Sequence, residues 1–158
     1  MGHDFNVDEI FQMAEQIERN GAKFYRDAAD SISDESAIQV LLDLSKMEDE
    51  HLILFEHLRS NLSGSDVEIT VFDPEGEAEQ YLRALADMRV FYQREIDTSS
   101  LEEVYKEAII AEKDSIVFYL GMKELVPERL GKDRIDKIIK EEMKHIRLLG
   151  NKLSQLKK

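Results

Sequence analysis

Apolar residues recur along four long segments of the chain at alternating steps of three and four positions. This spacing places them along one face of an α-helix, and a helix with one apolar stripe packs that stripe against other helices. Strong helix formers such as Ala, Leu, Glu and Lys are frequent in the same segments, and neither of the two prolines lies inside them. The pattern predicts helices over 6–31, 34–62, 100–126 and 133–156.

Capping signals support two of these boundaries. Asn6 with Glu9, and Ser100 with Glu103, have the spacing of a capping box. In this motif the side chains at the first and fourth positions each bond the other residue's backbone N–H. We therefore expect the first helix to start near Asn6 and the third near Ser100.

The stretch between the second and third helices has a different pattern. Val67, Ile69 and Val71 alternate as in a strand, which predicts an extended crossover segment, and a further helical pattern follows over 75–96.

These elements together predict one all-α domain over 1–158, an antiparallel four-helix bundle with a long crossover that contains an extra helix. We divide it into a helix pair over 6–62, the crossover over 63–98 and a second helix pair over 99–156. A chain of 158 residues buries enough surface to fold without disulfides, and it contains no cysteine.

Polar residues interrupt each of the four stripes near its middle. The first and third stripes are broken by a lone Glu, whereas the second and fourth are broken by a Glu followed three residues later by a His. The fourth stripe then continues through Leu149 and Lys152 to Leu156. The interrupting residues are Glu18, Glu48 with His51, Glu112, and Glu142 with His145.

The interruptions form an internal repeat. A shift of 94 positions superimposes Glu18 on Glu112, Tyr25 on Tyr119, Glu48 on Glu142 and His51 on His145. In each half the two glutamates are equidistant from a turn signal, at residue 33 in one half and at Pro127 in the other. Each therefore lies about 22 Å from its turn at a rise of 1.5 Å per residue, so all six side chains are expected in one layer of the bundle.

Electrostatics indicates what such a layer would hold. Four unpaired carboxylates in an apolar core would repel one another and lose their hydration. Two divalent cations would balance the four charges, and two neutral imidazoles would complete the ligand set. Oxygen-rich ligation with one imidazole per metal favours iron or manganese over structural zinc. The remaining histidines, His3 and His57, lie off the stripes, and we do not expect them to bind metal.

Composition excludes several other functions. The formal net charge of −13 argues against unaided binding to nucleic acid or to an anionic membrane. The absence of cysteine excludes an iron–sulfur cluster, a thiol nucleophile and thiolate-bound zinc in this sequence. The sequence contains no long apolar run, and its start lacks the pattern of a secretory signal, so we expect a soluble cytoplasmic protein.

The six interrupting residues resemble the ligand set of the ferritin-like di-iron carboxylate superfamily, and most closely that of the rubrerythrin four-helix domain. The resemblance covers nearly the whole chain and implies a ferritin-like bundle with two iron ions, with manganese, a mixed iron–manganese pair, or zinc on isolation as alternatives. It implies that Glu48 and Glu142 bridge the metals, while Glu18, Glu112, His51 and His145 each bind one.

Two tyrosines are also part of the resemblance. Tyr25 and Tyr119 follow Glu18 and Glu112 by seven residues, which is two turns along the same helix face. The resemblance implies that they lie beside the metal ligands and assist the reaction. The alternative is that they are core aromatics with satisfied hydroxyl groups.

The sequence departs from the rubrerythrin pattern in two ways. Rubrerythrins usually carry another Glu three residues after the third-helix ligand, where this chain has Ser115, so the ligand that lets one iron shift its coordination is in doubt. They usually also carry a cysteine-rich rubredoxin domain. Because this sequence has no cysteine, its electrons are expected from an external donor such as a rubredoxin-like protein or a reductase.

Three functions are consistent with these residues. The favoured one is a di-iron oxidoreductase that reduces hydrogen peroxide or dioxygen, in a peroxidase-like role against oxidative stress. The second is a ferroxidase that passes iron to a store; the same ligands would serve it, but we expect a homodimer and not a storage cage. The third is a metal-free helical interaction module, although the stripes offer no Arg and only Lys152 to compensate the acids.

Overall fold

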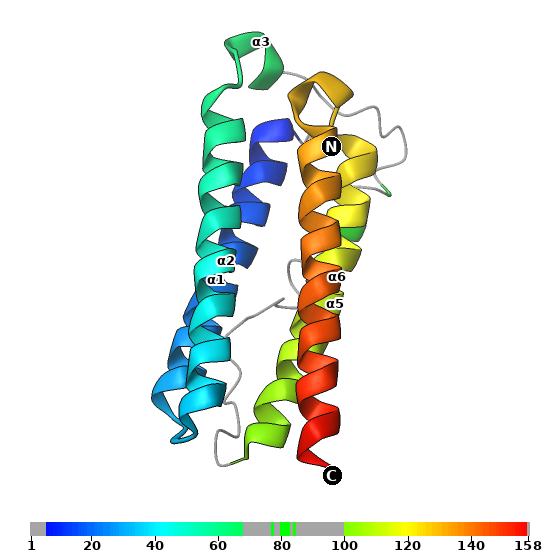
Figure 1. The fold of residues 1–158 in the computed structure, drawn as a ribbon. Helices are drawn as coiled ribbons and strands as arrows, with labels where there is room; N and C mark the ends of the chain where they lie inside the picture. The colour runs from blue at the N-terminus through cyan, green and yellow to red at the C-terminus, as the bar shows by residue number, and fades with distance from the viewer. Residues whose placement is uncertain (1–5, 68–76, 78–79, 83, 85–99, 158) are drawn as a thin grey trace.

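The computed structural model describes residues 6–67, 77, 80–82, 84 and 100–157. Its elements are α1 (Val7–Asp30), α2 (Glu35–Ser60), α3 (Gly64–Val67), α5 (Leu101–Leu125), the 3-10 turn η1 (Glu128–Leu130) and α6 (Lys132–Leu156). Figure 1 shows two antiparallel helix pairs side by side, α1 with α2 and α5 with α6. The all-α bundle is confirmed, and each long helix ends within two residues of its expected limits.

The helix starts confirm the capping signals in part. The N–H of Glu9 donates to Oδ1 of Asn6 at 2.9 Å, and the N–H of Asn6 donates to Oε2 of Glu9 at 3.2 Å, so the first capping box is complete. At α5 the N–H of Glu103 donates to Oγ of Ser100 at 3.4 Å. The Glu103 carboxylate lies 3.5 Å from Nζ of Lys106.

The core lies between the four long helices and follows the apolar stripes. Aromatic rings connect the two helix pairs, because Phe55 of α2 packs against Phe11 of α1 and Tyr119 of α5, with ring centroids 6.4 and 5.4 Å apart. The fourth stripe differs at its end. Leu156 is 46 % exposed, and Leu153 packs against the core in its place. This part of the expected stripe is wrong because α6 ends there.

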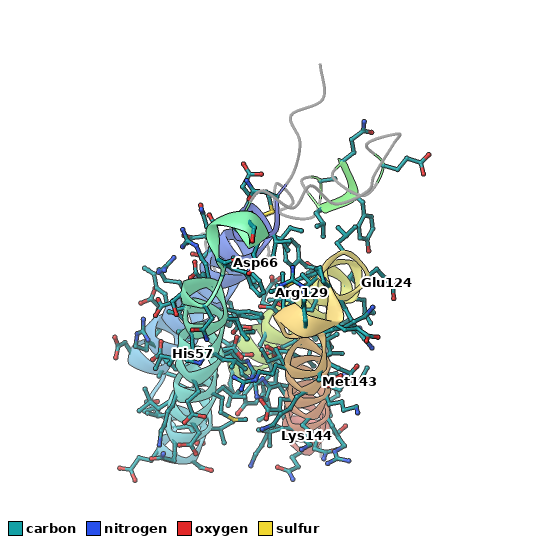
Figure 2. All side chains as sticks on the ribbon, turned by 90° about the horizontal axis from the view of Figure 1, so that it is seen from above. His57, Asp66, Glu124, Arg129, Met143 and Lys144 are labelled. Atoms are coloured by element: carbon teal, nitrogen blue, oxygen red, sulfur yellow. The ribbon has the colours of Figure 1, made fainter. Side chains whose placement is uncertain are left out.

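The turn between α5 and α6 packs against the end of α2. Gly131 caps η1 with a φ of +118°, a conformation that L side chains rarely adopt, and a Cβ placed there would lie 3.0 Å from Cδ2 of Leu58. Beside it, Nη1 of Arg129 lies 2.6 Å from Oδ1 of Asp66, and Figure 2 shows these two residues at the same end of the bundle. This ion pair connects α3 to η1.

The expected extended segment is wrong at Val67, which ends the helical turn α3. Local capping explains the difference. The N–H of Ser63 donates to Oδ2 of Asp66 at 2.9 Å, and the N–H of Asp66 donates to Oγ of Ser63 at 3.2 Å, a reciprocal pair that starts a helix. Ile69 and Val71 lie outside the described residues.

The expected extra helix over 75–96 lies mostly outside the described residues, and those of its residues that are described are helical. Two of them pack on α5. The hydroxyl of Tyr81 donates to the carbonyl oxygen of Val117 at 3.4 Å, and Leu82 is buried. Gly121 permits this approach, because a Cβ there would lie 2.7 Å from Cε1 of Tyr81.

Within the described part of the chain, no helix combines the length and the apolar character needed to cross a membrane.

Candidate metal centre

Each long helix contributes to one buried polar cluster inside the bundle. The six residues picked out by the interrupted stripes are all at most 3 % exposed. Because Glu and His three positions apart share a helix face, α2 and α6 each present both side chains to the interior. The cluster consists of Glu18 from α1, Glu48 and His51 from α2, Glu112 from α5, and Glu142 and His145 from α6.

His51 reaches carboxylates on two other helices. Its Nδ1 lies 3.0 Å from Oε1 of Glu142 and 3.5 Å from Oε2 of Glu18. Its Nε2, on the far side of the ring, lies 2.6 Å from Oε2 of Glu141. Both ring nitrogens of this histidine therefore contact carboxylates.

His145 faces the cluster in the same way. Its Nδ1 lies 3.1 Å from Oε2 of Glu142, 3.3 Å from Oε1 of Glu48 and 3.3 Å from Oε1 of Glu112. The two imidazole rings are nearly parallel, with an interplanar angle of 20° and centroids 6.0 Å apart. The repeat seen in the sequence is therefore also present in the arrangement of the histidines.

The cluster divides into two overlapping groups of potential ligands, in each of which the ligand atoms lie within 4.8 Å of one another. The first group is Glu18, Glu48, His51 and Glu142; the second is Glu48, Glu112, Glu142 and His145. Each group offers three carboxylates and one imidazole, and the two groups share Glu48 and Glu142. This is the arrangement that two neighbouring cations with shared carboxylates require.

The two tyrosines bond carboxylates across the bundle. The Tyr25 hydroxyl on α1 donates to Oε1 of Glu112 on α5 at 2.6 Å, and the Tyr119 hydroxyl on α5 donates to Oε1 of Glu18 on α1 at 2.5 Å. Burial, followed by the neighbouring carboxylates, raises the pKa of both phenols well above 10, so both remain hydrogen-bond donors. Each tyrosine thus holds the lone glutamate of the other half.

The buried carboxylates perturb one another. Burial, and then the nearby negative charges, raises the pKa of Glu48 and of Glu142 well above the usual value of 4.5. Burial also acts to raise the pKa of Glu112, but hydrogen bonds from Glu142, His145 and Tyr25 outweigh it and lower that pKa. The pKa is therefore shifted in opposite directions at the two glutamates shared by both groups and at Glu112.

The histidines are perturbed in the opposite sense to ordinary buried imidazoles. Burial lowers their pKa, but the hydrogen bonds and charges of the carboxylates outweigh it and raise the pKa of His51 to about 11 and that of His145 to about 10. A metal ion binds the neutral form of an imidazole, so it competes with the protons that these carboxylates hold on the two histidines. Metal binding would therefore release protons.

Unpaired polar atoms indicate that the cluster fits metal ions. Buried polar atoms in native proteins nearly always have hydrogen-bond partners. Among the described residues, the buried side-chain atoms without one all belong to this cluster: Oε2 of Glu18, both carboxylate oxygens of Glu48, Oε2 of Glu112 and Nε2 of His145. Carboxylate oxygens left unpaired in an apolar core are explained if cations bind them.

The comparisons with known proteins agree with this geometry. No family model and no curated protein matches the chain. A solved structure does match: a crystal structure from Thermotoga maritima, provisionally described as a ferritin-like diiron-carboxylate protein. It is 26 % identical in sequence, the match covers 96 % of each chain, and the TM-score is 0.69. The chain has a ferritin-like fold.

The resemblance to ferritin-like di-iron carboxylate proteins is thus confirmed, and the buried cluster is compatible with a di-metal site. The structure brings together all six expected residues and both tyrosines. His57 is exposed on α2 and belongs to neither group, and His3 lies outside the described residues. Ser115 is buried, and its Oγ donates to the carbonyl oxygen of Ala111 at 3.0 Å.

Glu141 of α6 contacts Nε2 of His51 but was not among the site residues expected from the sequence. Glu141 lies one position off the stripe, so helical periodicity alone does not place it in the interior. One signal in the sequence could have indicated it: Glu141 directly precedes Glu142, the glutamate that lies three positions before His145.

Proposed function

We propose that this ferritin-like protein is a di-iron oxidoreductase that reduces hydrogen peroxide or dioxygen with electrons from an external donor. The observation that carries the proposal is the pair of buried ligand groups that share Glu48 and Glu142. In this proposal Glu18 and His51 complete one iron position, and Glu112 and His145 complete the other. The similarity to a diiron-carboxylate protein over 96 % of the chain supports iron as the metal.

Two iron ions bound there would supply Lewis acidity and one electron each, as needed with two protons to reduce one peroxide to two waters. The burial of all six residues supports a small oxidant, because a large substrate could not reach the cluster without moving a helix. The donor that returns the electrons would be a separate molecule, for which a rubredoxin-like protein or a reductase is suited.

The protein's own residues keep the site in place. Tyr25 and Tyr119 donate hydrogen bonds to Glu112 and Glu18, which fixes the orientation of both carboxylates and leaves their other oxygens unpaired. One turn beyond His51, the buried Phe55 packs against Tyr119 with ring centroids 5.4 Å apart, so the tyrosine that bonds Glu18 is itself held by apolar packing.

The test is a single-turnover reaction of the anaerobic iron(II) protein with hydrogen peroxide. We expect each chain to consume one peroxide as both irons are oxidised, which an absorbance change would report. Once a chemical reductant is added, the protein should turn over repeatedly. His51→Ala should abolish the reaction, whereas His57→Ala, which removes an exposed histidine of the same helix, should leave it unchanged. Iron(II) protein that does not react with peroxide or dioxygen would contradict the proposal.

The same ligands could instead serve iron storage. Size-exclusion chromatography separates the two functions, because the oxidoreductase is expected as a homodimer and storage requires a large hollow assembly. An assembly of many subunits that retains ferric iron after oxidation would replace the proposal with ferroxidase function. A purified protein without metal, whose melting temperature iron or manganese does not shift, would favour a helical interaction module.

A further inference from the structure

The two histidines of the cluster differ at the ring nitrogen that points away from the carboxylates. Both direct Nδ1 into the cluster. Nε2 of His51 lies 2.6 Å from Oε2 of Glu141, whereas Nε2 of His145 has no hydrogen-bond partner among the described residues. Two halves that offer the same ligands therefore hold their imidazoles differently.

The internal repeat shows where this difference arises. Glu141 directly precedes Glu142, and the matching residue 94 positions earlier, directly before Glu48, is Met47. A carboxylate accepts a strong hydrogen bond from an imidazole N–H, whereas a thioether sulfur is a weak acceptor. The chain thus offers a carboxylate to His51 and a methionine at the corresponding position for His145.

A carboxylate behind an imidazole changes how that imidazole binds a metal. The hydrogen bond from Nε2–H fixes the tautomer, so that the lone pair lies on Nδ1, and it holds the ring in one orientation and makes it a stronger ligand. Removal of such a partner typically costs about 10- to 100-fold in metal affinity. The imidazole of His51 is therefore oriented before a metal arrives, and that of His145 has no such support at Nε2.

We propose that Glu141 is a positioning residue that makes the two metal positions unequal. The position that uses His51 binds its ion first and more tightly, and the position that uses His145 fills second. This inference rests on the di-metal function proposed above. Glu141 belongs to neither ligand group, and its side chain is 28 % exposed, so it acts through His51 and not as a ligand.

The test is an anaerobic titration of the metal-free protein with cobalt(II), which is visible by its absorption spectrum and is not oxidised under these conditions. The wild type should bind two ions in two resolved steps, the first about 10- to 100-fold tighter. Glu141→Ala should weaken the first step by a similar factor and leave the second unchanged. Glu141→Gln, which keeps an acceptor oxygen, should restore part of the loss. Met47→Glu should strengthen the second step.

Double variants assign the effect to His51. Glu141→Ala should lower the cobalt affinity of a His145→Ala protein, but it should not change the affinity of a His51→Ala protein. Glu50→Ala removes an exposed acid next to His51 in the sequence and controls for the loss of one negative charge. Circular dichroism of each variant shows whether it is folded, and Met47→Glu tests the inference even if Glu141→Ala does not fold.

Three outcomes would overturn the inference. These are a wild type that binds both ions in a single step, a Glu141→Ala protein that is unchanged, and one in which both steps weaken equally. In each of them the protein still binds two ions, so the di-metal function stands. A wild type that binds no cobalt, iron or manganese would contradict both the inference and the function on which it rests.

Discussion

The helix pairs α1–α2 and α5–α6 bring the same residue types to the cluster, but different contacts hold the two helices of each pair together. In the first pair Arg59 reaches from α2 to α1, with Nε 2.8 Å from Oδ1 of Asp8 and Nη1 2.8 Å from Oε2 of Glu15. The residues 94 positions later are Ile109 in place of Glu15 and Leu153 in place of Arg59, and both pack partly against the core. At these positions an ion-pair network in the first half corresponds to apolar packing in the second, whose own ion pair, between Lys123 and Asp136, lies elsewhere on α5 and α6.

A second level shows the same contrast. Oγ of Ser45 on α2 donates to the carbonyl oxygen of Ala22 on α1 at 3.0 Å, and Nη1 of Arg26 lies 3.2 Å from Oδ2 of Asp49. The second half has the buried Ile139 at the position of Ser45. Polar contacts in the first helix pair and apolar packing in the second thus hold helices that carry the same ligands.

The largest expected effect concerns the residues that the halves have in common. Glu48→Ala and Glu142→Ala should each remove both metals, because these two carboxylates belong to both ligand groups. Glu18→Ala and Glu112→Ala should each remove about one of the two metal ions, because each of these glutamates belongs to one ligand group only. Metal analysis of protein reconstituted with iron(II) measures this, with His57→Ala as the unaffected control. Loss of metal from the variants of one half only would contradict the assignment of metal ligands to both halves.

The next largest effect is expected when the ion pairs between α1 and α2 are replaced by the apolar residues found at the same positions of α5 and α6. Arg59→Leu leaves the buried Glu15 without its partner and should lower the free energy of unfolding by about 1–3 kcal/mol, measured by urea denaturation. The double variant Glu15→Ile with Arg59→Leu copies Ile109 and Leu153, and it should recover most of the loss, because it removes the buried charge of Glu15 together with its partly exposed partner.

An exposed pair between the same two helices is the control for this experiment. Nη2 of Arg19 lies 3.9 Å from Oε1 of Glu56, and both side chains are 51 % exposed. Glu56→Gln should therefore change the free energy of unfolding by less than about 1 kcal/mol. If Arg59→Leu has no larger effect than Glu56→Gln, the ion pairs of Arg59 do not stabilise this helix pair. If the double variant is less stable than the single one, apolar packing cannot replace them.

The features that the sequence predicted well are those that depend on helix geometry. A periodicity of 3.6 residues decides which side chains share a face, and a rise of 1.5 Å per residue decides their height. Glu18 and Glu48 could therefore be placed in one layer from their equal distance to a turn. The contact of Glu141 with His51 depends on how α6 is rotated relative to α2, which periodicity within one helix does not determine.

Local chemistry at chain ends and turns accounts for the expectations that failed. Leu156 continues the spacing of its stripe, but at the end of α6 it is 46 % exposed. Val67 belongs to a short strand-like alternation, but the hydrogen bonds between Ser63 and Asp66 start a helical turn before it. At Val67 an alternation of three residues is too short to outweigh this local capping, and at Leu156 the stripe runs out because α6 ends there.

A smaller effect is expected at the two hairpin turns, which also differ between the halves. Asp34 caps α2 with its side chain, whereas Gly131 precedes α6 with a φ of +118° and no side-chain cap. Gly131→Ala should cost about 1–2 kcal/mol, because Ala is strained in this conformation and its Cβ would approach Leu58. Gly150→Ala, inside α6 with open space around it, should instead stabilise by about 0.5–1 kcal/mol. Thermal unfolding shows whether the signs differ.

The smallest effect concerns the ion pair that connects the halves at one end. Hydrogen bonds from Ser63, and then Arg129, lower the pKa of Asp66 to about 2. A carboxyl with a lowered pKa stabilises the folded protein at pH values above its pKa in the unfolded chain, which is about 4, and this stability is lost as the pH falls towards 2.

Urea denaturation should therefore give Asp66→Asn a lower free energy of unfolding than the wild type. This difference should be constant above about pH 5 and should disappear towards pH 2. Glu124→Gln, which removes an exposed acid near the end of α5, controls for the loss of one negative charge. A deficit of Asp66→Asn that does not change with pH would mean that the connection between the halves does not depend on this charge, and that packing of Leu58 against the Gly131 turn holds this end of the bundle.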